Sequence, residues 1–292
     1  SVRSWLTTRS VTGEALPARR PMTGSAADSF RRGLTLSASG DEAGARAAFE
    51  AAVSADSGAF RAEYNLGVLA DRAGNEEEAL RHYRNAIRIQ PDYEAALEGI
   101  CTIHIRNARA GEAVSFMRPI AERWVRNLAV KAVYGRALVA AGREADAIAA
   151  MRPALRRDER FVPVLRVVIA ANLSLGRREL AESVLTQALT VDDDDAELHF
   201  FRARLYEDDD RLREAIDEYQ RAITLRPDYA DARTAVGLLL LAGANYTEAL
   251  AQFEIVARLQ SRVAATHLHL GEAYRSTKNW EMRVQSLSEM KP

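Results

Sequence analysis

Two stretches of this chain carry nearly the same sequence. Residues 77–96 read EEALRHYRNAIRIQPDYEAA and residues 213–232 read REAIDEYQRAITLRPDYADA, so the copies lie 136 residues apart. The offset is four times 34, which indicates a 34-residue period along the chain. Units that start at residues 26, 60, 94, 128, 162, 196, 230 and 264 align without an insertion up to residue 292. Such a chain is expected to stack its units as an array, in which each unit contacts mainly its neighbours.

Each unit has the residue pattern of a pair of helices. Unit positions 4, 7, 8 and 11 share one helical face and predict a first helix, helix A, while positions 20, 24 and 27 predict a second, helix B. Small residues at positions 8 and 20 let the two backbones come close, and a large residue at position 24 fills the adjoining space. Position 20 is arginine (Arg283) in the eighth unit and alanine in the other seven, namely Ala45, Ala79, Ala113, Ala147, Ala181, Ala215 and Ala249.

The connections within and between the units also carry signals. Glycine recurs at position 15, where a helix C-terminus in the left-handed conformation suits it best. Pro91 and Pro227 are expected to end helix B in the two quoted stretches, and the aspartate after each is expected to cap the next helix A. The position-15 glycines are Gly40, Gly74, Gly142 and Gly176.

These units resemble tetratricopeptide repeats, which carry a small residue at position 8, alanine at 20, a large apolar residue at 24 and often proline at 32. Residues 64–93, YNLGVLADRAGNEEEALRHYRNAIRIQPDY, show the pattern most fully. The resemblance covers residues 26–292 and leaves residues 1–25 as a leader or linker. It implies an all-α fold, a right-handed α-α superhelix or solenoid, with helix A on the concave side and helix B on the convex side.

In the family, the groove face of helix A carries unit positions 2, 5, 9, 12 and 13. Here that face combines arginines with apolar side chains, which suits an extended or helical peptide with acidic and hydrophobic residues. The alternative is that the arginines pair with neighbouring carboxylates of the chain itself. The candidate partner-binding residues are Tyr64, Arg106, Arg136, Arg166, Phe200, Arg204, Leu238 and Leu241.

Bulk properties narrow the class of partner. The formal net charge is −1, so the chain lacks the overall basic field of a typical nucleic-acid-binding protein. The longest apolar run, Ala235 to Ala244, is too short to span a bilayer. The lysine and asparagine with which one class of these repeats clamps a peptide C-terminus are missing from positions 5 and 9. We therefore expect a protein or peptide partner, no nucleic acid and no transmembrane segment.

Residue patterns of catalysis, cofactor binding or metal binding are not found. No Gly-rich phosphate loop occurs, and His267 and His269 are two residues apart, which is not the i, i+4 spacing of a helical metal site. Cys101 takes the place of a position-8 glycine and is expected to serve packing. The acidic run Asp192–Asp195 is expected to favour a helix N-terminus. The sequence thus predicts a protein that is no enzyme and holds no cofactor or metal.

The expected function is a non-enzymatic scaffold that binds a peptide or protein. Its architecture and arginine-rich composition resemble bacterial envelope lipoproteins with such repeats, which serve pilus, secretion or gliding-motility machines. That resemblance implies a place on the periplasmic side of the outer membrane with a lipid anchor; a cytoplasmic location is the alternative. The leader, through Trp5, and the C-terminal unit are further candidate docking segments. The rival hypothesis is the repeat region of a larger enzyme, such as a glycosyltransferase.

Overall fold

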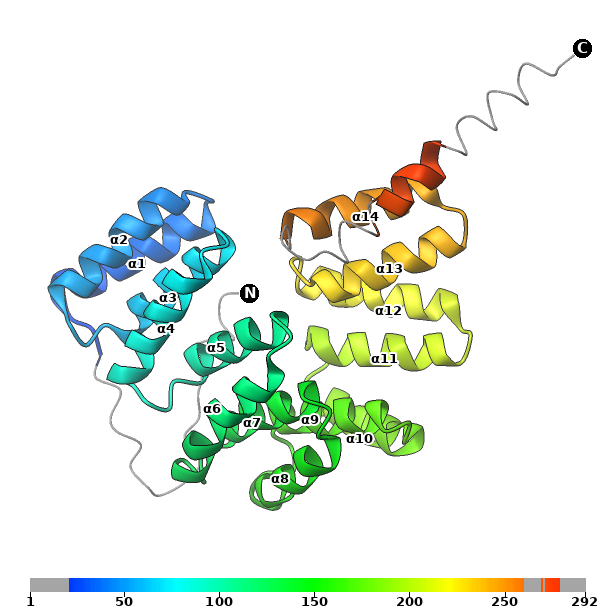
Figure 1. The fold of residues 1–292 in the computed structure, drawn as a ribbon, viewed down its shortest axis with the longest axis horizontal. Helices are drawn as coiled ribbons and strands as arrows, with labels where there is room; N and C mark the ends of the chain where they lie inside the picture. Colours follow the sequence, from blue (N-terminus) through cyan, green and yellow to red (C-terminus); the bar gives the residue numbers. More distant parts are fainter. Residues whose placement is uncertain (1–20, 260–268, 270, 279–292) are drawn as a thin grey trace, which may run out of the picture. The chain divides into compact units, whose positions relative to one another are not determined.

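The computed structural model describes residues 21–259, 269 and 271–278, and these residues form an array of helices without a strand (Figure 1). Residues 1–20 of the predicted leader, with Trp5, and most of the eighth unit lie outside the described residues, so their docking roles stay predictions. The helices are α1 (Gly24–Ala38), α2 (Glu42–Ala55), α3 (Phe60–Arg72), α4 (Glu76–Ile89), α5 (Glu94–Arg106), α6 (Ala110–Arg123), α7 (Leu128–Ala140), α8 (Glu144–Arg157), α9 (Val162–Ser174), α10 (Arg178–Val191), α11 (Ala196–Asp208), α12 (Leu212–Leu225), α13 (Ala230–Ala242) and α14 (Tyr246–Leu259).

The helix bounds recur with the period of the sequence. From α3 to α13, each odd-numbered helix begins 34 residues after the previous one, starting at Phe60, and the even-numbered helices do the same from Glu42. Helix α1 is the exception, because it begins at Gly24, before the predicted start of the first unit. Odd-numbered helices therefore correspond to helix A and even-numbered ones to helix B. The all-α repeat fold predicted from the sequence is confirmed.

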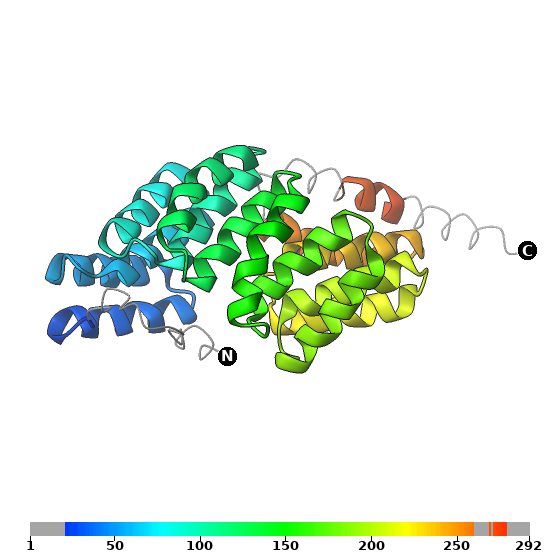
Figure 2. The ribbon, with the colours of Figure 1, turned by 90° about the horizontal axis from the view of Figure 1, so that it is seen from below.

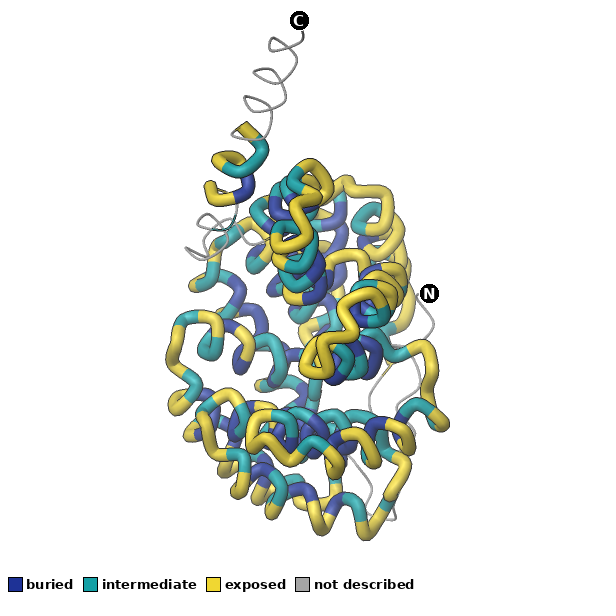
Figure 3. Tube along the Cα trace, turned by 90° about the vertical axis from the view of Figure 1, so that its right-hand side faces the viewer, coloured by how far each residue is buried: buried dark blue, intermediate teal, exposed yellow. Residues whose placement is uncertain are grey.

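The chain divides into two compact units, residues 1–154 and residues 155–292. The consecutive helices from α1 to α7 pack beside one another in the first unit, as do those from α9 to α14 in the second (Figure 2). Buried and exposed residues alternate along the helices, and the exposed ones gather at the turns and outer sides (Figure 3). The core is accordingly a row of small clusters, such as the one around Tyr83 in the first unit and the one around Tyr219 in the second.

The packing positions behave as their residue types predict. All seven alanines at position 20 are fully buried, as are the large side chains at position 24 from Phe49 to Phe253. The close approach at position 8 is also present, since a Cβ atom added to Gly67 would lie 2.6 Å from the Tyr83 ring. Cys101 is buried at this position, and burial raises the pKa of its thiol to about 12. A thiol with so high a pKa is a packing group rather than a nucleophile.

The turn between helices A and B uses the left-handed conformation in every repeat from the first to the seventh. The four position-15 glycines have φ values from +67° to +83°, as predicted. Three other repeats place a side chain there, and these residues keep a positive φ: Ala108 (57°), Asp210 (58°) and Ala244 (61°). An L-residue pays roughly 1–2 kcal/mol for this conformation. The turn geometry is therefore imposed by the packing of the two helices and not by glycine.

The predicted caps after the two prolines are wrong. Helices α5 and α13 begin after Tyr93 and Tyr229, and neither N-cap receives a side-chain hydrogen bond. Asp92 is instead fully buried and accepts hydrogen bonds from Gln90 and, over 3.1 Å, from Asn127 Nδ2. Asp92 thus links two successive inter-repeat turns, because Asn127 is itself the N-cap of α7.

The cap predicted for the acidic run is present. Asp195 is the N-cap of α11, and its Oδ1 accepts hydrogen bonds from the backbone nitrogens of Glu197 (2.9 Å) and Leu198 (3.1 Å). The carboxylate satisfies two of the amide groups that a helix N-terminus leaves without intrahelical partners. The run therefore has a structural role at this helix.

Candidate binding surface

The two aromatic candidates on the A helices are parts of aromatic clusters. Tyr64 on α3 packs against Tyr83 and Tyr93, with ring centroids 5.7 and 5.5 Å apart. Phe200 on α11 packs in the same way against Tyr219 (5.4 Å) and Tyr229 (5.1 Å). Both side chains are half-buried, so each offers one edge to a partner while the rest supports the fold.

Three of the four candidate arginines form ion pairs between neighbouring repeats. Arg106 Nη2 lies 2.7 Å from Asp71 Oδ1 and 3.1 Å from Glu76 Oε1. The Arg136 guanidinium lies 2.5 Å from the carboxylate of Glu98. Arg166 pairs with Glu197 over 3.0 Å and approaches the capping Asp195. These three arginines thus pair with neighbouring carboxylates of the chain itself, which is the alternative to partner binding.

The fourth arginine differs from the others. Arg204 is exposed on α11, and within the described part of the chain it forms no ion pair. Leu238 occupies the same unit position on α13 and is 40% exposed. Leu241 is half-buried, because it packs against the cluster of Ala249 and Phe253. Among the described residues, the second unit therefore presents a cation in no ion pair and an exposed leucine at equivalent places on two A helices.

A comparison with models of known protein families identifies the family of this chain. The family model described as tetratricopeptide repeat matches residues 30–94, 171–230 and 234–281, more than half of the chain. The chain belongs to the tetratricopeptide repeat family. No match was found among curated proteins.

Solved structures with this fold include proteins from distant organisms. A thermophilic tetratricopeptide repeat protein of Thermus thermophilus is 26% identical with a TM-score of 0.52, and the match covers 63% of this chain and 100% of that one. A tetratricopeptide repeat protein from Parabacteroides merdae is 16% identical with a TM-score of 0.59 over 86% of this chain and 99% of its own. Yeast Tom70 is 13% identical with a TM-score of 0.61, covering 94% and 69%. The last two likenesses show the fold alone.

Tetratricopeptide repeats generally act as protein-interaction scaffolds, and stacked repeats provide extended surfaces for that purpose. No helix among the described residues is long and apolar enough to cross a membrane. Nor does the described part of the chain gather three or more side chains that could hold a metal ion. The surface of the A helices is therefore the main candidate site of this tetratricopeptide repeat chain.

A buried polar pair joins helices A and B in the second repeat. His82 Nδ1 on α4 lies 2.7 Å from Glu63 Oε2 on α3, and both side chains are nearly buried. Burial alone would raise the pKa of Glu63. The hydrogen bonds from His82 and Asn85 and the nearby positive charge outweigh burial, so this pKa lies below its ordinary value of 4.5. The ionised carboxylate is therefore stabilised in the folded repeat.

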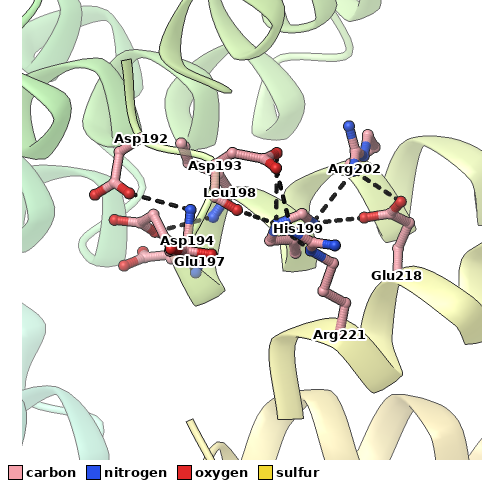
Figure 4. Close-up of polar contacts among 10 residues, drawn as sticks. Asp192, Asp193, Asp194, Glu197, Leu198, His199, Arg202, Glu218 and Arg221 are labelled. Atoms are coloured by element: carbon pink, nitrogen blue, oxygen red, sulfur yellow. Dashed lines mark hydrogen bonds and ion pairs between the residues drawn. The ribbon is translucent and has the colours of Figure 1, made fainter. Parts of the chain in front are cut away.

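The sixth repeat contains a similar histidine–glutamate pair, but here the histidine lies on helix A and the glutamate on helix B. His199 on α11 is fully buried, and its Nδ1 lies 2.7 Å from Glu218 Oε2 on α12 (Figure 4). Arg202 and Arg221 surround the pair: Arg202 Nη2 lies 2.8 Å from Glu218 Oε1, and Arg221 Nη2 donates to Asp193 Oδ2 over 3.1 Å. His199 occupies unit position 4, on the helical face that the spacing predicts for helix A, but its pairing with Glu218 was not predicted.

Each missed pair could have been found in the sequence by its offset. Histidine and glutamate are separated by 19 residues in both repeats. Arg233 and Gln252, which form a hydrogen bond of 3.0 Å in the seventh repeat, have the same separation. Complementary polar residues at unit positions 4 and 23 are therefore a signal for a contact between helices A and B.

Proposed function

We propose that this chain is a non-enzymatic scaffold whose second unit binds a peptide or protein segment on the A helices α11 and α13. The observation that carries the proposal is the pairing of exposed Arg204 with exposed Leu238 at one unit position of successive A helices. Phe200 lies one helical turn before Arg204 and supplies an aromatic edge. A segment with a carboxylate followed by an aliphatic side chain matches this surface.

The second unit is a better candidate than the first because it contains Arg204, a candidate arginine that is in no ion pair within the described residues. An acidic ligand that approached Arg106 or Arg136 would have to displace Asp71 or Glu98 from it. Arg204 requires no such exchange, so a ligand carboxylate gains a charge-assisted hydrogen bond without breaking one. We assign Arg106, Arg136 and Arg166 to holding successive repeats together, and Tyr64 to supporting the first unit.

For the biological setting we propose a bacterial multiprotein machine of the cell envelope, with the chain on the periplasmic side of the outer membrane as a lipoprotein. The supporting observation is compositional: lysine and arginine together number 40, and nearly all are arginine, as in GC-rich bacterial genomes. A lipidated cysteine upstream of Ser1 in the native protein would support the setting, and an initiator methionine there would contradict it.

Selection of peptides from a random displayed library on the immobilised chain tests the binding surface. We expect the selected peptides to combine acidic and aliphatic residues. Arg204→Gln with Leu238→Ser should weaken their binding by roughly ten- to a hundredfold, because a charged hydrogen bond and apolar burial are lost together.

The chain offers a matched control for this experiment. Leu212 and Arg213 are both exposed on α12, the B helix of the sixth repeat, which also contains Arg204. Leu212→Ser with Arg213→Gln changes the same residue types and the same charge away from the proposed surface. Equal loss of binding in the two double variants would show that the A-helix surface is not the site.

A further inference from the structure

The outward faces of the B helices in the first unit carry an unusual row of arginines. Arg84 on α4, Arg118 on α6 and Arg152 on α8 all occupy unit position 25, and all are exposed. Arg88 adds a second exposed cation one turn further along α4, and Arg123 is a further exposed cation at the last residue of α6. We call these five residues the arginine row.

The repeat fold does not require these arginines. Position 25 is Glu50 in the first repeat and Thr186, Gln220 and Glu254 in the fifth, sixth and seventh. Nor does the helix dipole explain the position-25 arginines, because that effect is confined to the last turn, where only Arg88 and Arg123 lie. Within the described residues, the three position-25 arginines form no ion pair.

Helices α4 and α6 are the B helices of successive repeats and pack against one core cluster. Leu80 and Ile87 of α4 and Phe116 of α6 all pack against the same core cluster, which is built around Tyr83. Arg84 and Arg118 lie on the solvent sides of these two helices. Because stacked repeats repeat their surface positions along the array, the equivalent arginines of three successive repeats form one charged row.

An apolar spot adjoins the basic face at the end of α6. Val125 directly follows Trp124 and is 56% exposed, the largest exposure among the exposed aliphatic side chains of the first unit. The guanidinium of Arg123 lies 5.3 Å from the ring centroid of Trp124. Arginine, tryptophan and an exposed aliphatic side chain together are typical of surfaces that rest at the interface of a membrane.

We propose that the arginine row, with Val125, is a docking face for an anionic phospholipid surface. Basic residues near such a surface each add binding energy, and the attraction falls off within a Debye length, so the local charge counts and the net charge of −1 does not prevent it. An exposed valine gains from the lipid interface but has no such role against phosphates of DNA. This face is separate from the proposed peptide surface, which lies on the A helices.

Cosedimentation of the full chain with phosphatidylcholine vesicles, with and without phosphatidylglycerol, tests the proposal. We expect binding only to the anionic vesicles, and its loss when salt is raised from about 0.1 M to about 1 M, where the Debye length falls from about 10 Å to about 3 Å. Replacing Arg84, Arg118 and Arg152 together by glutamine should weaken partitioning on the order of a hundredfold. Val125→Ser should weaken it several-fold.

The matched control replaces Arg177, Arg213 and Arg258 of the second unit by glutamine, which makes the same change of net charge at exposed sites. This variant should sediment like the wild-type chain, and the helical circular dichroism of all variants should be unchanged. Equal loss in the two triple variants, or no binding to anionic vesicles, would overturn the proposal. The proposal would also be overturned if the chain bound a DNA oligonucleotide tightly but did not bind vesicles, and if Val125→Ser left the DNA binding unchanged.

Discussion

The second and sixth repeats have nearly the same sequence, with different consequences. Each surrounds a position-24 tyrosine, Tyr83 or Tyr219, with an aromatic residue from helix A and the tyrosine of the following turn. The shared residues thus build the same core twice. What differs lies at the pair between the helices, at the close-contact position and at the turn, so comparing the repeats separates what the fold needs from what it tolerates.

The polar pair is the clearest difference. Glutamate on helix A faces histidine on helix B in the second repeat, and histidine on helix A faces glutamate on helix B in the sixth. The contact has the same length in both, 2.7 Å. In these two repeats the same pair of positions therefore holds one acid and one imidazole, and either helix can supply either group.

Exchanging the pair in the second repeat tests this interchangeability and has the largest expected effect. Glu63→His alone leaves two histidines at the contact, and His82→Glu alone leaves two carboxylates. Each single variant should lower the unfolding free energy by about 3 kcal/mol, as breaking a buried ion pair does. The double exchange should recover most of that loss. Urea unfolding measures the loss in the single variants and the recovery in the double variant. Hydrogen exchange of the α3 and α4 amides shows whether the change lies in this repeat.

The same exchange in the sixth repeat supplies the control. His199 and Glu218 also contact Asp193, Arg202 and Arg221, so His199→Glu with Glu218→His should recover less than its counterpart. Equal recovery in both repeats would mean that the surrounding arginines contribute nothing to the pairing.

Acid supplies a second readout of the pair in the second repeat. Because the folded-state pKa of Glu63 lies below 4.5, the carboxylate stabilises the fold at pH values above 4.5, and this contribution is lost as the pH falls through the lowered pKa. The stability advantage of the wild type over Glu63→Gln should therefore shrink on acidification. An advantage that grows in acid would contradict the assignment.

The frame of this protein could be predicted from its sequence because packing restricts single positions strongly. Alanine at position 20 and a large side chain at position 24 reflect contacts inside one helix pair, such as Ala79 with Tyr83, so one register places all of them. The caps were predicted less well. Asp92 binds Asn127, which lies in another turn 35 residues away, and a local rule does not include such a partner.

For the candidate site, the sequence predicted only the groove face of helix A, a stripe formed by unit positions 2, 5, 9, 12 and 13. The stripe correctly placed Arg106 and Arg136 on helix A, but their pairing depends on the neighbouring repeat. Their carboxylate partners lie 35 and 38 residues away, close to one repeat length. Opposite charges at such offsets would have shown that these arginines are already balanced, and would have left Arg204 as the candidate.

The close-contact position gives the second test of the comparison. Gly67 meets Tyr83 in the second repeat, whereas the sixth repeat holds a side chain, Ala203, at the same position. Gly67→Ala should destabilise the first unit by about 1 kcal/mol or more, because its Cβ would lie 2.6 Å from the tyrosine ring. Thermal unfolding monitored by circular dichroism measures the change.

Gly271 provides a control for helix propensity. It is also helical, but among the described residues no atom would lie within 4 Å of an added Cβ. Gly271→Ala should therefore be neutral or gain up to about 1 kcal/mol. If Gly67→Ala stabilised the protein by a similar amount, the second repeat would have room for a side chain, and the difference from the sixth would not be steric.

The turn gives the smallest expected effect. Gly74 in the second repeat and Asp210 in the sixth occupy the same left-handed turn, with φ of 75° and 58°. Gly74→Ala should cost about 1 kcal/mol, while Asp210→Gly should gain only about 0.5 kcal/mol, because aspartate tolerates this conformation better than alanine does. Ala244→Gly, at φ 61°, should gain about 1 kcal/mol and rank above Asp210→Gly in urea midpoints. The reverse ranking would mean that the side chain of Asp210 does not relieve the backbone, so that the packing of α11 on α12 alone holds it there.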